Sequence, residues 1–469
     1  MTDRVRRLND RPVPSAAKYV LYWTQMNRRA TANHALAYAI DLANRQSLPL
    51  VVYEGLTCSY PHANDRLHSF ILEGVPGNAK RFRALGASYV FHLRRKQSDP
   101  NNALYRVAED AAAVVTDDYP TFIPVKHNAS APSKIACPYL AVDSSCVVPM
   151  NRHEKREYAA YTIRPKITKL LPGYLQPVET PKLKRKWDGA AAFPELHTEV
   201  AEGDIPKLVA QCEIDHTVPR SISFAGGETA ALKRLSAFLD KNLARYAAGR
   251  NEPSEHATSN LSPYLHFGHI SALHVALEAK RHAAENKLVA DEFLEELIVR
   301  RELAFNYARH VERPESFCNL PDWAKATLRK HAADRREPSY SREEFEHART
   351  HDTLWNACQK EMLLRGKIHG YYRMYWGKKI IEWSETCQDA LDTMIYLHDR
   401  YALDGRDPNT YTNILWCFGL HDRPWTERAV FGQIRWMSLD GMKRKTDVDA
   451  YLKEIEFLER TGKDPFHLT

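Results

Sequence analysis

The sequence lacks the features that mark membrane proteins, secreted proteins and proteins with zinc sites or disulfide frameworks. No run of about 18 apolar residues occurs in the 469 residues, so we expect no membrane span. The first residues also lack the apolar stretch of a secretory signal peptide. The eight cysteines form no CxxC pair, which argues against a zinc site and against a disulfide framework. We therefore expect a protein of the cytoplasm, with access to the nucleoid, reduced thiols and no bound metal.

Glycine is scarce, and acidic residues are fewer than basic ones. The chain has 19 glycines, and no GxGxxG follows the first predicted strand, so the common dinucleotide-binding fingerprint is absent. The 66 basic residues outnumber the 59 acidic ones, which gives a formal net charge of +7. This charge permits a polyanionic partner such as a nucleic acid but does not identify one.

The N-terminal third of the chain alternates between strand and helix patterns. Buried strands are predicted at 18–25, 48–55, 88–93, 112–118 and 139–148. Helices are predicted between them, at 33–47, 64–84 and 102–111. This alternation predicts a parallel sheet with helices on both faces. Residues 1–15 are basic, contain two prolines, and are predicted to form a loose arm.

The pattern changes after about residue 150. A proline-rich, charged stretch at 171–189 is typical of a linker. Beyond it, helices are predicted at 228–247, 270–286, 289–310, 352–364 and 367–385. The predicted fold class is therefore α/β plus all-α, with a Rossmann-like domain at 1–170, a linker at 171–200 and a helical domain at 201–469.

Tryptophan is plentiful, with nine residues, and three of them are close in sequence. In a helix over 367–385, Trp376 and Trp383 lie on one side, about 10 Å apart along the axis, and Trp355 lies upstream. The plain explanation is the buried face of a core helix. The alternative is a path for electron hopping, because indole is easily oxidised, and that path requires a redox centre nearby.

Two further stretches allow either a structural or a chemical interpretation. The segment 258–271 opens with small polar residues and a Ser-Pro, which favours an anion site at a helix start or simply a helix cap with Pro263 in the first turn. The turn 404–409 is rich in Asp, Gly and Pro. It is either a structural turn or a holder for the polar edge of a ring.

Charged residues interrupt the otherwise apolar helix pattern at 295–307. Glu296, Arg300 and Glu302 lie within it. Glu296 and Arg300 have the spacing of a surface ion pair. The alternative is a carboxyl group that points into a cleft and binds a substrate.

Taken together, these stretches resemble the DNA photolyases in their order and spacing. The resemblance is carried by FAGGETAALKRLSAFL, TSNLSPYLHFGHIS, EELIVRREL, LDGRDPN, LHDRPW and the three tryptophans. EYAAYTIRPKI and MKRK make the chain most similar to the class II cyclobutane pyrimidine dimer photolyases. The resemblance covers the chain from about residue 18 to about residue 455.

The resemblance implies a cofactor, FAD, held by the helical domain in a U shape. The residues implied to contact the flavin nucleotide or to lie beside it are Tyr246, Ser259, Asn260, Leu261, Ser262, Arg300, Arg373, His398, Asp404 and Asp407. The electron-transfer tryptophans are Trp355, Trp376 and Trp383. The residues implied to touch the dimer or the DNA around it are Glu296, Met374, Trp416, Arg423 and Trp425.

The implied activity is light-dependent repair of UV-damaged, double-stranded DNA by a monomer. The dimer is flipped out of the duplex, receives an electron from photoexcited reduced FAD, splits, and returns the electron. We expect activity to require light and to fall steeply with salt. Relatives often hold a second antenna chromophore, such as a deazaflavin, in the α/β domain, and the residues here do not decide whether one binds.

The chain departs from the family pattern at three places. His398 stands in Leu-His-Asp where the class II motif has Leu-Asn-Asp, with the Asn facing the flavin N5. Histidine can titrate near neutral pH, which predicts unusual stability of the flavin radical, unless the imidazole simply replaces the amide hydrogen bond. Thr410 replaces the usual Gly of Pro-Asn-Gly, and Arg300 stands where some relatives carry a lesion-stacking Trp.

Three other functions remain as alternatives at this point. A cryptochrome-like blue-light receptor would keep FAD and the tryptophans but lose the dimer contacts, so Glu296, Met374 and Trp425 favour repair. A nucleotide-binding or adenylating enzyme would need a Gly-rich phosphate loop after the first strand, where the chain has WTQMNRRAT. A non-catalytic helical scaffold would leave the purified protein colourless.

Overall fold

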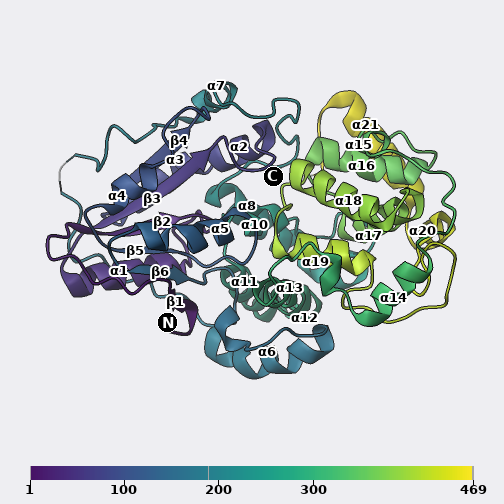
Figure 1. The fold of residues 1–469 in the computed structure, drawn as a ribbon, viewed down its shortest axis with the longest axis horizontal. Coiled ribbons are helices and arrows are strands. Elements are labelled where there is room, and N and C mark those ends of the chain that lie inside the picture. Colours follow the sequence, from purple (N-terminus) through teal and green to yellow (C-terminus); the bar gives the residue numbers. More distant parts are fainter. Residues whose placement is uncertain (1, 189, 467–469) are drawn as a thin grey trace.

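The structure is a computed structural model that describes residues 2–188 and 190–466. A sheet with its helices forms one side of the molecule, and a helical part forms the other (Figure 1). This agrees with the fold class predicted from the sequence. The boundaries predicted for the domains remain a prediction, and helix α6 (Ala160–Tyr174) runs across the one placed at 170.

Six strands form one sheet in the order β1-β6-β5-β2-β3-β4. Their bounds are β1 (Val5–Arg7), β2 (Tyr19–Thr24), β3 (Leu50–Thr57), β4 (Ser88–Arg94), β5 (Ala111–Asp117) and β6 (Tyr139–Val142). Strands β2 to β6 pair in parallel, and β1 pairs antiparallel with β6. Every residue of β2 and β5 is buried, as expected for strands covered on both faces.

The helices of the α/β part lie against the sheet (Figure 1). They are α1 (His34–Gln46), α2 (Asp65–Leu72), α3 (Val75–Ala84), α4 (Ala103–Ala108) and α5 (Phe122–Ser130). The helix predicted at 64–84 is therefore two helices, α2 and α3, and Pro76 lies in the first turn of the second. The strand predicted at 139–148 ends at Val142.

The prediction of a loose arm at the N-terminus is wrong for residues 2–7. A 3₁₀ helix, η1 (Thr2–Arg4), leads into β1, which pairs with the edge strand β6. Arg4 is buried, and its guanidinium donates to the carbonyls of Cys146 at 2.8 Å and Val147 at 2.6 Å. The basic residues that suggested an exposed arm are thus partly used to close the sheet edge.

The helical part contains most of the longer helices. Their bounds are α7 (Ile205–Ala210), α8 (Glu228–Lys241), α9 (Tyr246–Gly249), α10 (Ser262–His266), α11 (Ala272–Asn286), α12 (Asp291–Leu294), α13 (Arg301–Arg309), α14 (Asp322–Lys330), α15 (Arg342–Glu346), α16 (Thr353–Arg365), α17 (Gly370–Trp383), α18 (Cys387–Tyr401), α19 (Pro408–Cys417), α20 (Leu439–Lys445) and α21 (Val448–Thr461). Short 3₁₀ helices are η2 (Pro132–Lys134), η3 (Met150–Arg152), η4 (Glu202–Asp204), η5 (Leu243–Arg245), η6 (Pro253–Glu255) and η8 (Phe317–Asn319).

The helix predicted at 289–310 is interrupted by a π-helical segment, η7 (Glu295–Arg300), between α12 and α13. π-Helical turns are rare and are often found at functional sites. The hydrophobic periodicity of the sequence could not reveal this segment, because one wider turn shifts the apolar stripe only slightly. It contains Glu296 and Arg300, which the sequence had singled out.

Buried polar side chains join the two parts. Arg66 of α2 is 1% exposed, and its guanidinium donates to the carbonyls of Pro219 at 3.0 Å, Met362 at 2.9 Å and Tyr401 at 2.8 Å. Tyr119, just after β5, donates its hydroxyl to Asp407 at 2.6 Å. Side chains of the α/β part thereby satisfy backbone and carboxylate acceptors at helix ends of the helical part.

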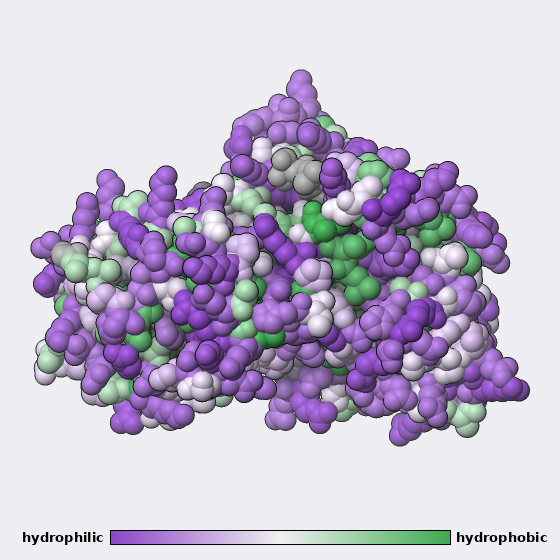
Figure 2. Space-filling model, turned by 90° about the horizontal axis from the view of Figure 1, so that it is seen from above, coloured by the Kyte–Doolittle hydropathy of each residue, from purple (hydrophilic) through white to green (hydrophobic). Residues whose placement is uncertain are grey.

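The surface and the cysteines are unexceptional. The face seen from above is mostly hydrophilic, with exposed apolar residues gathered near its middle (Figure 2).

All eight cysteines are free. Within the described ranges, no helix has both the length and the apolarity needed to cross a bilayer. Nor do residues 2–188 and 190–466 bring together three or more His, Cys, Asp or Glu side chains that could hold a metal ion.

Candidate active site

A pocket of about 710 Å³ lies within the helical part. Its walls come from α9, the 258–262 segment, η7, α17, α18 and α19. This volume is in the range of cofactor and ligand sites. The predicted site residues that line it are Tyr246, Ser262, Glu296, Arg300, Arg373, Met374, Trp376, His398, Asp404 and Trp416.

The other predicted site residues lie outside the pocket lining. Trp355 and Trp383 are buried behind Trp376, and Asp407 is buried on the side of α19 that faces Tyr119. Arg423 and Trp425 lie at the protein surface. The remaining ones are Ser259, Asn260 and Leu261, in the segment that leads into α10.

An ion pair crosses the pocket wall between α17 and the turn before α19. Arg373 Nη2 lies 3.0 Å from Asp404 Oδ1, and the hydroxyl of Ser262 donates to Asp404 Oδ2 at 2.7 Å. Burial raises the pKa of Asp404, but Arg373, Lys367 and Ser262 outweigh burial and hold that pKa below its usual value. The carboxylate is therefore ionised, and it orders a guanidinium at the pocket wall.

The 258–262 segment keeps polar groups beside the pocket. Asn260 has a left-handed φ of 54°, a conformation that Asn tolerates better than most residues. No side-chain hydrogen bond caps α10 at Leu261, and Pro263 occupies its first turn. The hydroxyl of Ser262 donates to Asp404, and that of Ser259 accepts from the backbone N–H of Leu261 at 3.4 Å, so neither caps α10. The anion site at this helix start stays a prediction.

The three tryptophans form a continuous chain of ring contacts that starts at the pocket. Trp376 lines the pocket, and its ring stacks on Trp355 at a centroid distance of 6.2 Å and an angle of 6°. The ring of Trp383 meets Trp355 edge-on, at a centroid distance of 6.4 Å and an angle of 67°. The indole N–H of Trp355 donates to the carbonyl of Trp376 at 3.0 Å, which fixes the order of the rings. The sequence placed two of these indoles on one helix, but only the structure inserts the third between them.

His398 faces the pocket in a fixed, neutral form. Its Nδ1–H donates to the carbonyl of Met394 at 3.0 Å, and its ring meets Trp376 edge-on at 5.0 Å. Burial lowers its pKa to about 3, assisted by the nearby charge of Arg373. The expectation that this imidazole titrates near neutral pH is therefore wrong. With Nδ1 protonated, Nε2 is left as a hydrogen-bond acceptor.

Replacing His398 with Asn is expected to flatten the pH dependence of stability. His398 has a pKa of about 3 in the folded protein against an ordinary value of 6.5, so it takes up a proton on unfolding between these values. Its contribution to the free energy of unfolding is therefore lost as the pH falls below 6.5, at up to about 1.4 kcal/mol per pH unit. Urea unfolding followed by circular dichroism at about pH 5 and about pH 7 measures this slope.

The matched control is His347→Asn, at an exposed histidine of the helical part. This variant should keep the wild-type slope. A slope for His398→Asn equal to that of the wild type would contradict the buried, neutral assignment.

Glu296 has a partner that the sequence analysis missed. Arg250 Nη1 donates to Glu296 Oε1 at 2.7 Å, and its guanidinium also lies over the ring of Tyr246 at 6.0 Å. All three residues line the pocket. The expected pair of Glu296 with Arg300 does not form, since Arg300 lies 3.4 Å from Glu295 instead. No local spacing signals the pair of Arg250 with Glu296, because the two residues are 46 positions apart in the sequence.

Aromatic rings and cations alternate from the pocket to the surface near Trp425. Lys378 lies 5.0 Å over the ring of Trp416, and Arg435 lies 5.3 Å from the same ring and 4.2 Å from that of Trp425. Arg423 covers Trp425 at 5.0 Å, and this indole is 36% exposed. Such cation–π contacts hold an otherwise mobile exposed indole in place.

A second, smaller pocket of about 80 Å³ lies where the carboxyl ends of the strands meet the helical part. Its lining includes Trp23, Tyr119, His127, His266 and Arg406. The sequence left open whether an antenna chromophore binds, and this small pocket does not decide it. The α/β part contributes Trp23, Tyr119 and Arg28 to the lining, whereas His266 and Arg406 come from the helical part.

Comparisons with known proteins identify the family. The DNA photolyase family model matches residues 20–182. A deoxyribodipyrimidine photo-lyase of the archaeon Methanothermobacter thermautotrophicus is 41% identical over 97% of this chain and 98% of its own length. One from Oryza sativa is 40% identical over 95% of this chain and 88% of its own length.

Solved structures share the fold at low sequence identity. A cryptochrome of Synechocystis superposes with a TM-score of 0.68 at 16% identity, covering 97% of this chain and 92% of its own. A class III photolyase of Agrobacterium tumefaciens gives 0.66 at 19% identity, covering 97% and 90%. Given relatives about 40% identical that match almost end to end, this chain belongs to the DNA photolyase family.

Proposed function

We propose that this protein repairs cyclobutane pyrimidine dimers in DNA by a light-dependent reaction, as a class II photolyase with FAD in the 710 Å³ pocket. Its relatives are named deoxyribodipyrimidine photo-lyases. The observation that carries the proposal is a chain of three buried indoles in contact, which begins at the wall of a cofactor-sized pocket.

The residues of the pocket suit FAD. Thr258 and Ser262 bring polar side chains of the 258–262 segment to the pocket wall, where a pyrophosphate would lie, and Arg373 with Asp404 offers a charged edge to a polar ring. Arg373 Nε and His369 Nε2 are buried and have no hydrogen-bond partner within the described residues, and both residues line the pocket. Buried polar atoms left without partners are costly, so these two atoms support a polar ligand here.

A bound, reduced flavin supplies the electron donor when it absorbs blue or near-UV light. Trp376, Trp355 and Trp383 would carry an electron in from the far side to keep such a donor reduced, since they lead from the pocket wall into the protein. The Nε2 atom of His398 is unprotonated, so it would accept a hydrogen bond from an N–H of the flavin ring and could not donate one.

The DNA side of the proposal rests on the mouth of the pocket. Glu296 and Met374 line the pocket, where they would meet a dimer flipped out of the duplex. Trp416 lines the pocket as well, and Trp425 with Arg423 stands at the surface, where an indole and a guanidinium suit the gap left in the stack. We propose that a monomer binds double-stranded, UV-damaged DNA.

The test is repair of a thymine-dimer oligonucleotide by the purified protein under blue light and in darkness, followed by chromatography of the strands. Repair should require light, the protein should show a flavin spectrum, and DNA affinity should fall steeply between about 50 and 200 mM salt. Equal repair in darkness would contradict the proposal. A yellow protein that photoreduces but never repairs would instead be the cryptochrome-like receptor.

A further inference from the structure

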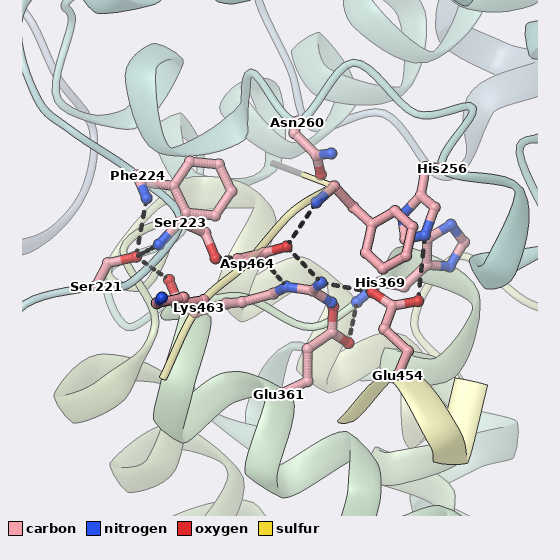
Figure 3. A network of polar contacts seen from close by, with 12 residues as sticks. Ser221, Ser223, Phe224, His256, Asn260, Glu361, His369, Glu454, Lys463 and Asp464 are labelled. Carbon is pink, nitrogen blue, oxygen red and sulfur yellow. Dashed lines mark hydrogen bonds and ion pairs between the residues drawn. The ribbon is translucent and has the colours of Figure 1, made fainter. Parts of the chain in front are cut away.

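The last described residues fold back against the helical part beside the pocket (Figure 3). Helix α21 ends at Thr461, Gly462 takes a left-handed φ of 63°, and the chain then buries Asp464, which is 1% exposed. Asp464 accepts from Arg365 Nε at 2.6 Å and from the hydroxyl of Ser223. A carboxylate this deeply buried is stable only with such partners.

Arg365 connects Asp464 to one wall of the pocket. It is the last residue of α16, and its guanidinium contacts the carboxylates of Glu361, Glu454 and Asp464. The turn that follows, 366–370, supplies four lining residues of the pocket, 367–370. Glu361 also accepts from the backbone N–H of His369 at 3.1 Å, so the same cluster fixes the backbone of that turn.

The cluster also reaches the 256–262 segment, through His256. Its Nε2 lies 3.1 Å from Glu454 Oε2, and its ring stacks on Phe466 at a centroid distance of 4.4 Å and an angle of 11°. His256 comes two residues before Thr258, which lines the pocket. Figure 3 shows Asp464 between Ser223 on one side and Glu454 and His256 on the other.

We propose that Asp464 and Phe466 are positioning residues of the cofactor pocket. The 462–466 turn joins the 256–262 segment to the 366–370 turn, and it thereby holds two walls of the pocket in place before a ligand binds. A pocket ordered in advance binds more tightly, because less conformational entropy is lost on binding. The ligand's identity as FAD rests on the proposed function, whereas the ordering of the two walls does not.

The test compares Asp464→Asn and Phe466→Ala with the wild type by hydrogen exchange of the full-length protein without ligand. Peptides covering 256–262 and 366–370 should exchange at least about tenfold faster in the variants, while peptides of β2 and β5 keep their rates. Titration with FAD should then give a Kd about tenfold weaker. Asp464→Glu, which keeps the carboxylate, should restore part of the affinity.

The matched control is Lys463→Ala, which removes an exposed side chain from the same turn. It should leave both exchange and affinity unchanged. Unchanged exchange at the two walls, or exchange raised equally over the whole chain, overturns the proposal. If Asp464→Asn fails to fold, Phe466→Ala decides alone, because its half-exposed ring contributes little beyond the stack on His256. A wild type that binds no FAD but shows the exchange pattern overturns the proposed function and leaves this inference standing.

Discussion

Replacing Trp376 with Phe is expected to reduce light-driven reduction of the bound flavin to the background rate. Trp376 is the ring of the stack that lines the pocket, and Trp355 lies 6.2 Å further away. A phenyl ring fills much of the same space but is far harder to oxidise. The proposed electron path therefore loses the residue that passes the electron to the flavin. Stability should fall by no more than about 2 kcal/mol, since the cavity left is small. Flavin absorbance recorded under blue light with an external reductant measures the effect.

Two comparisons make this result specific to the stack. Trp187→Phe removes an indole that packs on Tyr19 of the sheet, far from the stack in sequence and structure, and should photoreduce normally. Repair by Trp376→Phe should recover when its flavin is reduced chemically beforehand. Normal photoreduction by Trp376→Phe would rule out the proposed electron path.

Replacing Asp404 with Ala is expected to weaken FAD binding about 100-fold, or by about 3 kcal/mol. The substitution leaves Arg373 without its buried carboxylate partner and removes the acceptor of the Ser262 hydroxyl. An unpaired buried guanidinium is strongly unfavourable, so the wall should rearrange or take up water. The ratio of flavin to protein absorbance after gel filtration, and a fluorescence titration of the flavin-free protein, measure the loss.

The companion variant is Asp392→Asn on the exposed side of α18, which should retain flavin like the wild type. Asp404→Asn should fall between the two, because an amide keeps the hydrogen bond from Ser262 but not the charge. Full flavin content in Asp404→Ala would show that the ion pair does not shape the site.

The fold was largely accessible from the sequence, because buried strands and amphipathic helices leave strong periodic patterns. The five predicted strands exist, and the predicted helix at 352–364 corresponds to α16 at Thr353–Arg365. The errors occur where tertiary contacts decide. Residues 2–7 form structure because Arg4 finds carbonyl acceptors in a segment some 140 residues away, which no local pattern encodes.

The site was accessible only in part. Residue types and their order indicated an anion segment, a charged turn and three indoles, but not that the indoles contact one another in the order Trp376, Trp355, Trp383. The pairing of Glu296 with Arg250, and the low pKa of His398, also depend on packing. Distances and burial arise from long-range packing, so sequence spacing alone could not supply them.

The contacts of Arg66 bear on whether the two parts can exist apart. Arg66 belongs to the α/β part, and its guanidinium donates to the carbonyls of Met362 in the last turn of α16 and Tyr401 at the end of α18. A fragment that lacks the sheet would expose these two carbonyls. The last turn of α16, which leads into the pocket, would then lose its hydrogen bonds from Arg66. We therefore expect each half, if expressed separately, to be insoluble or unfolded. We also expect changes of sheet residues during evolution to be constrained by the backbone acceptors that the helical part presents to them.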